Sequence, residues 1–158
     1  IGIENVIGSA FNDVLVGNGL TNHLVGGAGR DALDGGAGGD ILRGGNGADT
    51  LTGGSGADAF VFNGAPGPSN IDAITDFSVV NDVIRLDDAV FAGLTVGVLT
   101  AAAFHIGAAA ADASDRIIYN SLTGALYFDA DGVGAAAQIQ FATLDAGLLL
   151  TRSDFVVI

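Results

Sequence analysis

Large apolar residues recur at every ninth position between residues 15 and 60, with mostly small or polar residues between them. The recurring residues are Leu15, Leu24, Leu33, Leu42, Leu51 and Phe60. A glycine stands seven positions before each of them, at Gly8, Gly17, Gly26, Gly35, Gly44 and Gly53. Six units in one register do not arise by chance in a chain of average composition, so this segment is an internal repeat.

Each unit divides into a turn and a short strand. In units three to six the first six positions read GGxGxD, and their glycines permit positive φ and leave backbone carbonyls uncovered. The last three positions form a strand whose central side chain points to one face. A strand this short needs neighbours, so we expect two units to make one coil and coils to stack at about 4.8 Å. The apolar side chains then fill the interior, and the turns stack along two edges.

The sixth position of each unit carries a carboxylate or its amide. The residues there are Asp13, Asn22, Asp31, Asp40, Asp49 and Asp58. Stacked carboxylates repel one another unless a cation lies between them. Ca²⁺ takes about 6 to 8 oxygen ligands in irregular geometry, whereas Mg²⁺ demands an octahedron and softer metals prefer His or Cys. Asp and Gly also favour turns without any ligand, an explanation that suits one isolated unit better than six in register.

The pattern GGxGxDxUx from Gly8 to Phe62 resembles the RTX (repeats-in-toxin) family of hemolysin-type, bacterial repeats, which form a calcium-binding parallel β-roll. The resemblance implies that calcium lies between turns one coil apart. The earlier turn then contributes the carbonyls of positions two and four and its Asp. The later turn contributes the carbonyls of positions one and three and its Asp. We therefore expect about four or more calcium ions.

The resemblance implies four calcium sites. Two of them lie between units that follow the pattern fully, and the other two each include one of the first two units. The first pair of sites consists of Gly27, Gly29 and Asp31 with Gly44, Asn46 and Asp49, and of Gly36, Gly38 and Asp40 with Gly53, Ser55 and Asp58. The second pair consists of Ser9, Phe11 and Asp13 with Gly26, Ala28 and Asp31, and of Asn18, Leu20 and Asn22 with Gly35, Ala37 and Asp40. The last of these has one carboxylate fewer and should bind more weakly. The first two units alternatively serve as the capping start of the roll.

The repeat stops after Phe62, and the stretch 63–70 (NGAPGPSN) predicts a turn-rich joint. Several short β-like runs follow, whereas helical patterns at 87–94 and 100–111 predict no more than a turn or two. We therefore predict an all-β fold in two parts. Residues 1–62 form a parallel β-roll, and residues 63–158 form an antiparallel β-rich cap over its exposed edge.

The segment after the repeats also resembles that of serralysin-type secreted proteins, whose aspartates help to close the last calcium site. The resemblance implies a site in which Gly54, Gly56 and Asp58 are joined by Asp76 and Asp82. A strand-end aspartate that caps a turn is the open alternative.

Other polar motifs carry weaker signals. The stretch 128–134 (FDADGVG) lacks the remaining EF-hand ligands and predicts a tight turn, and metal binding by Asp129 and Asp131 stays open. His23 is expected to face solvent, and neither it nor His105 has partners for a zinc site. HExxH, GxSxG and P-loop motifs are missing from the sequence, so we expect a binding module and not an enzyme.

Composition narrows the function further. The formal net charge of −13 excludes a nucleic-acid binder of the usual basic kind and argues against binding to an anionic membrane. No apolar stretch is long enough to insert into a bilayer, and without cysteine there is no disulfide or thiolate metal site. The resemblance to RTX proteins implies a secreted, extracellular protein, and the absence of cysteine is compatible with export.

Both ends of the chain suggest a larger context. The start, IGIENVIGSAFND, reads as mid-protein sequence, so we interpret the chain as the C-terminal piece of a longer protein. The last six residues, SDFVVI, resemble the uncleaved signal of type I secretion substrates. A final strand packed in the core is the alternative, and both can hold because export precedes folding. The expected partners are calcium, the type I secretion machinery, and an upstream catalytic or adhesive domain. The parent is then a secreted hydrolase (a protease, lipase or polysaccharide-modifying enzyme), or an adhesin or surface-layer protein that binds glycans or cells.

Overall fold

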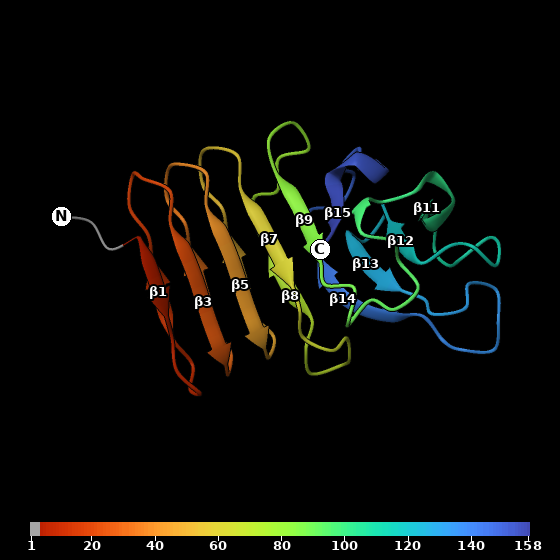
Figure 1. Ribbon diagram of the computed structural model, residues 1–158, viewed down its shortest axis with the longest axis horizontal. Helices are drawn as coiled ribbons and strands as arrows, with labels where there is room; N and C mark the ends of the chain where they lie inside the picture. Colours follow the sequence, from red (N-terminus) through yellow and green to blue (C-terminus); the bar gives the residue numbers. More distant parts are fainter. Residues whose placement is uncertain (1–3) are drawn as a thin grey trace.

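The computed structural model describes residues 4–158, which form short strands and two single-turn 3₁₀ helices (Figure 1). The strands of the repeats are β1 (Asn5–Ile7), β2 (Val14–Val16), β3 (His23–Ala28), β4 (Ala32–Asp34), β5 (Ile41–Asn46), β6 (Thr50–Thr52) and β7 (Ala59–Phe62). The remaining strands are β8 (Asp72–Ile74), β9 (Val83–Leu86), β10 (Gly97–Val98), β11 (Phe104–Ile106), β12 (Ile117–Asn120), β13 (Ala125–Phe128), β14 (Ile139–Thr143) and β15 (Phe155–Val157). The 3₁₀ helices are η1 (Ala101–Ala103) and η2 (Arg152–Asp154).

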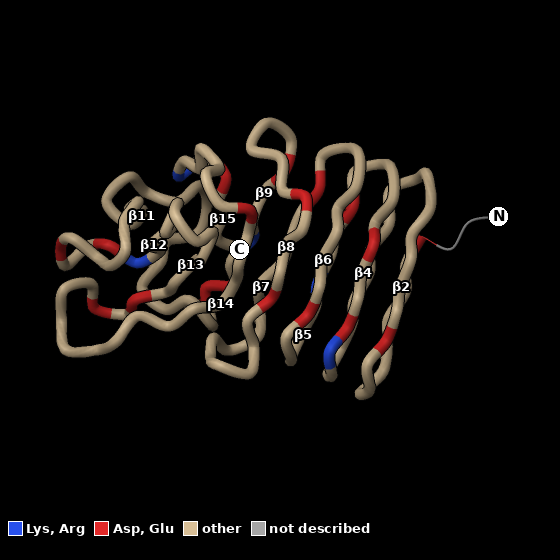
Figure 2. Tube along the Cα trace, turned by 180° about the vertical axis from the view of Figure 1, so that it is seen from behind, with Lys and Arg blue, Asp and Glu red and all other residues tan. Residues whose placement is uncertain are grey.

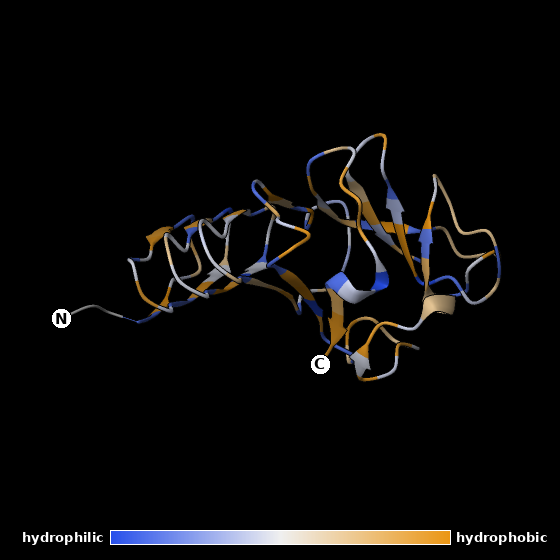
Figure 3. Cartoon of the chain, turned by 90° about the horizontal axis from the view of Figure 1, so that it is seen from above, coloured by the Kyte–Doolittle hydropathy of each residue, from blue (hydrophilic) through white to orange (hydrophobic). Residues whose placement is uncertain are grey.

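The strands form two sheets that face each other. One has the order β1-β3-β5-β7-β9-β15-β10 and the other the order β11-β12-β13-β14-β8-β6-β4-β2. Successive repeat strands thus alternate between the sheets, and two units make one coil. Seen from above, the coils form a flattened tube that widens at its C-terminal end (Figure 3). The predicted parallel β-roll is confirmed.

Neighbouring strands of the roll are parallel, and each residue pairs with the one two units later. Leu24 lies opposite Leu42, and Leu33 lies opposite Leu51. The expectation of three-residue strands is wrong for β3 and β5, which have six residues each. The pairing of these two strands continues into the turn, where Gly27 lies opposite Gly45, because glycine lets the two backbones approach closely.

The interior of the roll consists of the side chains that recur every ninth position. Those of Leu24, Leu33, Leu42, Leu51 and Phe60 are at most 1% exposed. Removing a leucine side chain from water contributes about 1.5 to 3 kcal/mol, so these residues supply much of the stability of the roll. Leu15 is only half-buried, because β2 is an edge strand with a neighbour on one side.

The cap continues both sheets of the roll. β8 pairs with β6 and β9 pairs with β7, both in parallel, so that the sheets cross residue 62 without a break. Beyond them, β12, β13 and β14 form the expected antiparallel meander, and β10 is antiparallel to β15. The pairs β14–β8, β15–β9 and β11–β12 are parallel. The joint is parallel because the cap extends the stacking direction of the coils and thereby covers their last strand edges.

An aromatic cluster fills the cap. Phe62 packs edge-on against Phe141 with ring centroids 5.1 Å apart, and Phe91 packs in the same way against Phe141 and Phe128. Such pairs contribute about 0.5 to 1.5 kcal/mol beyond their buried area. Phe62 belongs to β7, so the last coil of the repeats shares this core.

The C-terminal residues form a strand of the first sheet that has a neighbour on each side. β15 lies between β9 and β10, and Phe155 and Val157 are almost fully buried. The predicted final strand is therefore present. Within residues 4–158, none of the helices has the length and apolar character that crossing a membrane requires.

Candidate metal centre

The turns of the roll stack in two columns, and acidic residues recur from turn to turn along each column (Figure 2). In the four turns of the GGxGxD type, one side-chain oxygen of the aspartate at position six accepts a hydrogen bond from the backbone N–H of the corresponding residue one coil earlier. Asp31 accepts in this way from Asp13, and Asp49 from Asp31, both at 2.8 Å. In the second column, Asp40 accepts from Asn22 at 2.7 Å and Asp58 from Asp40 at 2.8 Å. The Oδ1 atoms thus tie each turn to the preceding one.

The second oxygen of these carboxylates has a different environment. The Oδ2 atoms of Asp31, Asp40, Asp49 and Asp58 are buried, and no donor within residues 4–158 reaches them. The four residues are only 1–2% exposed. An unpartnered charged oxygen in a buried position costs several kcal/mol unless a proton or cation accompanies it. Each of the four turns of the GGxGxD type therefore contains one buried carboxylate oxygen that lacks a hydrogen-bond donor or a cation.

In the first two turns, the side-chain oxygen at position six accepts a hydrogen bond from its own turn instead. Asp13 Oδ2 accepts from the backbone N–H of Ser9 at 2.6 Å and from its hydroxyl at 2.9 Å. Asn22 Oδ1 accepts from the N–H of Asn18 at 2.7 Å. Ser9 and Asn18 stand at position two, where the other four turns have glycines with φ between 91° and 116°. The departures from the repeat pattern thus coincide with a change in hydrogen bonding.

Backbone carbonyls converge on the unpartnered carboxylate oxygens. A Cβ on Gly26 would collide with Asp31 Oδ2 and would lie 2.6 Å from the carbonyl oxygen of Gly44 in the next turn. In the second column, a Cβ on Gly35 would lie 2.5 Å from Asp40 Oδ2 and 2.7 Å from the carbonyl oxygen of Gly53. Glycine at position one keeps both oxygens uncovered.

The donor set of these turns consists of oxygen atoms only. Across the described part of the chain, no three acidic or imidazole side chains gather into a metal-binding group. A cation at the turns must therefore take backbone carbonyls as well as carboxylates, which is the ligand chemistry of Ca²⁺. The residues present fit that ion.

The structure brings the sequence-predicted ligands into consecutive turns of one column. In the first column, turn 26–31 lies between turns 8–13 and 44–49, and Gly29 donates its N–H to the carbonyl of Asn46 at 3.0 Å. In the second column, turn 35–40 lies between turns 17–22 and 53–58, and Gly38 donates to the carbonyl of Ser55 at 2.8 Å. The remaining predicted ligands of these turns are Gly27, Gly36, Phe11, Leu20, Ala28 and Ala37, and they lie at the matching turn positions.

The two predicted ligands beyond the repeats also reach the last turn of the second column. Asp76 accepts from the N–H groups of Gly53 at 2.9 Å and Gly54 at 2.7 Å. Asp82 Oδ1 accepts from Asp58 at 3.0 Å, and its Oδ2 accepts from Ser78 at 2.8 Å. These carboxylates close the turn that contains Gly56 through hydrogen bonds to its backbone.

Sequence reasoning missed two residues at the corresponding end of the first column. Asp72 Oδ1 accepts from the N–H of Asp49 at 3.0 Å, and Asn70 Oδ1 accepts from the N–H of Gly47 at 2.6 Å. Asp72 stands 23 residues after Asp49, whereas the repeat step along a column is 18. The signal that could have found it is the order Asp, any residue, Ile at 72–74, which repeats positions six to eight of a unit.

Burial dominates the electrostatics of the columns. It raises the pKa of Asp40, Asp49 and Asp58, although the hydrogen bond from the preceding turn opposes the rise. Burial also raises the pKa of Asp72 to about 7, helped by the negative charges of Asp49 and Asp31. Without a cation, burial therefore favours the protonated form of these four carboxyl groups.

Three other candidates fall outside the columns. Asp129 Oδ1 accepts from the N–H groups of Asp131 and Gly132, as in the predicted tight turn. His105 lies 3.8 Å from Asp115. His23 alternates with the buried Leu24 along β3, as expected of an outward residue, but it is half-buried, and its Nε2 is covered and without a hydrogen-bond partner among the described residues.

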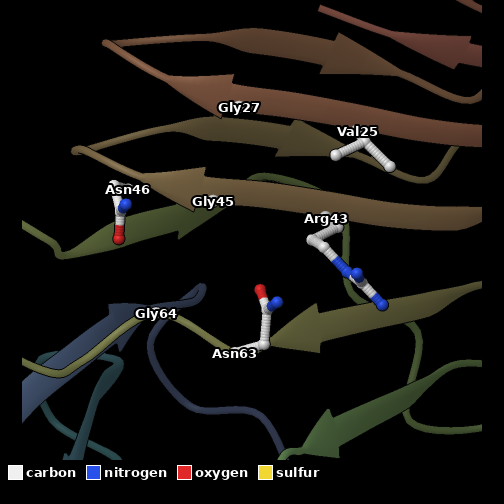
Figure 4. Close-up of a pocket in the computed structure, with 7 residues that line it drawn as sticks. All are labelled: Val25, Gly27, Arg43, Gly45, Asn46, Asn63 and Gly64. Carbon is white, nitrogen blue, oxygen red and sulfur yellow. The ribbon is translucent and has the colours of Figure 1, made fainter. Parts of the chain in front are cut away.

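A cleft of about 230 Å³ lies on the outer face of the first sheet (Figure 4). It is lined by Val25, Gly27, Arg43, Gly45, Asn46, Asn63 and Gly64. The Nε of Arg43 is buried and lacks a hydrogen-bond partner among the described residues. The cleft therefore offers a guanidinium and two side-chain amides to a polar ligand.

Comparisons with known proteins agree with this geometry. The family model of the RTX calcium-binding nonapeptide repeat matches residues 1–33, 16–50 and 34–64. Two similar solved structures are the R3 and R2 subunits of AlgE6, a mannuronan C5-epimerase of Azotobacter vinelandii. R3 is 28% identical with a TM-score of 0.63 and R2 is 26% identical with a TM-score of 0.65. Each similarity covers 96% of this chain, and 81% of R3 and 91% of R2. No curated protein sequence matches the chain.

Gly26→Ala tests whether the space beside Asp31 Oδ2 is needed for calcium. Gly26 does not have positive φ, so alanine adds volume without backbone strain. We expect the calcium midpoint of folding, followed by circular dichroism, to rise about tenfold, equivalent to about 1.4 kcal/mol. Gly19→Ala is the control, because a Cβ there meets nothing within 4 Å. Equal midpoints in the two variants would contradict the assignment.

The raised pKa values predict that acid favours the calcium-free fold. Because the folded-state pKa of Asp72 is about 7, against an ordinary value of 3.8, folding takes up a proton between these values. The contribution of protonated Asp72 to the stability of the folded chain is complete at low pH and is lost as the pH rises through about 7. Circular dichroism in chelator should show more β-structure at about pH 5 than at about pH 8. An ellipticity independent of pH would refute this prediction.

Proposed function

Because residues 1–64 are RTX calcium-binding nonapeptide repeats, we propose that the chain is a module of a larger secreted protein that folds when it meets extracellular calcium. The observation that carries the proposal is the set of four buried carboxylate oxygens without a donor. Each belongs to a turn of the GGxGxD type, and those of Asp31 and Asp40 lie beside a backbone carbonyl of the following turn. Calcium supplies the missing charge at these positions.

The proposed ligands are those that the stacked turns bring together. Carbonyls of Gly27 and Gly29 and the carboxylate of Asp31 bind one ion with the following turn, 44–49. Carbonyls of Gly36 and Gly38 and the carboxylate of Asp40 do the same with turn 53–58. The turns that contain Asp13 and Asn22 contribute less to calcium binding. Their side-chain oxygens already accept a hydrogen bond from the backbone of their own turn, and binding there first breaks that bond.

The size of the binding energy decides whether calcium controls folding. Extracellular calcium modules have dissociation constants of about 10⁻⁴ to 10⁻³ M. At a free calcium concentration ten times that constant, each site adds about 1.4 kcal/mol to stability. Four sites add about 5 to 6 kcal/mol, which is comparable to the whole stability of an ordinary domain. Calcium binding can thus determine whether the roll is folded.

This coupling suits a chain exported by the type I route. In the folded chain, Phe155 and Val157 of the C-terminal strand are buried between β9 and β10. A terminal signal is therefore accessible only before folding. Low calcium inside the cell keeps the repeats unfolded, and the higher calcium outside orders them after export.

Calcium dependence of folding is the direct test. Far-UV circular dichroism should show a coil in chelator at neutral pH and β-structure on addition of calcium, but not of equimolar magnesium. Asp31→Ala should raise the calcium midpoint strongly, because Asp31 lies between two stacked turns. Asp34→Ala removes an equal charge from an exposed outer position and should leave the midpoint nearly unchanged. A roll that is fully folded in chelator at neutral pH would refute the proposal.

A second candidate concerns the parent protein, which we propose is a polysaccharide-modifying enzyme. The supporting observation is that the similarity to the AlgE6 subunits extends over the cap as well as the repeats. A surface that binds substrate beside a catalytic domain is then expected, and the cleft at Arg43 has suitable chemistry.

Calorimetric titration of the calcium-loaded chain with mannuronan tests this candidate. Binding should weaken in Arg43→Gln and persist in Arg30→Gln, since Arg30 is an exposed residue outside the cleft. The absence of binding by the wild-type chain would count against a polysaccharide-binding role.

A further inference from the structure

We propose that the loop 63–71 and Asp72 complete a further calcium site with Asp49, at the cap end of the first column of turns. The inference rests on the proposed calcium function and adds a site formed by residues outside the nonapeptide pattern. Its ligands are the Oδ2 of Asp49, the carboxylate of Asp72 and the carbonyl of Gly45, with Asn70 as a supporting polar group.

The direction of each carboxylate leads to this site. Asp31 Oδ1 reaches back to turn 8–13, whereas its Oδ2 lies beside the carbonyl of Gly44 in the following turn. Asp49 occupies the same position one coil later, since its Oδ1 also reaches back and its Oδ2 lies against its own position-one glycine. By analogy with Asp31, we infer that the unpartnered Oδ2 of Asp49 faces the next element along the column, the loop that carries Asp72.

The loop reproduces the contacts of a nonapeptide turn with different residues. Gly64 approaches the carbonyl of Gly45, as Gly45 itself approaches the carbonyl of Gly27. The amide oxygen of Asn70 accepts from the N–H of Gly47, where a backbone carbonyl accepts in the earlier turns. Asp72 takes the place of the sixth position by accepting from the N–H of Asp49. A longer, non-repeating segment thus supplies the same oxygen-lined surface.

Asp72 has a free side-chain oxygen for a cation. Its hydrogen bond to the N–H of Asp49 uses Oδ1, and no further donor within residues 4–158 binds its side chain. At the end of the second column the situation differs, because each oxygen of Asp76 and Asp82 already accepts a backbone hydrogen bond. The proposed site at the cap end of the first column therefore has a carboxylate oxygen without a hydrogen bond, whereas those at the end of the second column are all hydrogen-bonded.

Counting bound ions in the full chain tests the site. Asp72→Asn keeps an acceptor for the N–H of Asp49 but removes the charge, so we expect one calcium ion fewer per chain in equilibrium dialysis. Asp88→Asn, an equal charge change at an exposed position, should bind the wild-type number. A wild-type chain that binds no calcium refutes the proposed function itself. Asp72→Asn with the wild-type number and affinity of ions refutes only the site.

A second measurement covers the case in which Asp72→Asn does not fold. Wild-type crystals grown with Tb³⁺ in place of calcium give anomalous peaks at the bound ions. A peak between Asp49 and Asp72 supports the site, and peaks at other turns with none at this position overturn it.

Discussion

The fold depends on how the buried carboxylates of the turns are neutralised. The stacking that buries the leucines of the roll also buries Asp31, Asp40, Asp49 and Asp58. Each of these aspartates uses one oxygen to hold the preceding turn and leaves the other without a donor. The apolar core therefore cannot form without placing these charges close together. Core formation thus requires that these charges be neutralised, and in the proposed function calcium provides the neutralising charge.

Glycine makes this arrangement possible at two kinds of position. At position one, as in Gly26, the missing Cβ leaves the space in which carboxylate and carbonyl oxygens meet. At position two, as in Gly45, positive φ and the absence of a side chain let one turn lie directly on the carbonyl of the turn before it. Glycine also raises the entropy of the unfolded chain. The residue that allows the site to form thus weakens the fold in the absence of the ion.

The nine-residue period predicted the parts of the structure that repeat. It identified the inward residues from the spacing of Leu, and, once successive short strands are placed on opposite sides, it also gave the two sheets and the two columns of Asp. The period could not place Asp72 and Asn70, since the loop before Asp72 adds residues and its path depends on packing against turn 44–49. It also missed the half-buried position of His23, which the neighbouring strands determine.

The columns have a direction, and this explains why the cap differs from the repeats. Each turn reaches back with Oδ1 and presents Oδ2 to the turn that follows, so a turn is complete only when its C-terminal neighbour is in place. The first turns need no such neighbour, because Ser9 and Asn18 satisfy their side chains locally. The last turns do need one, and the loops that carry Asp72, Asp76 and Asp82 provide it. These loops belong to a cap whose core is formed in part by packed aromatic rings. An ordered cap therefore gives the last coil a fixed surface, and each coil ordered on it prepares the surface for the coil before it.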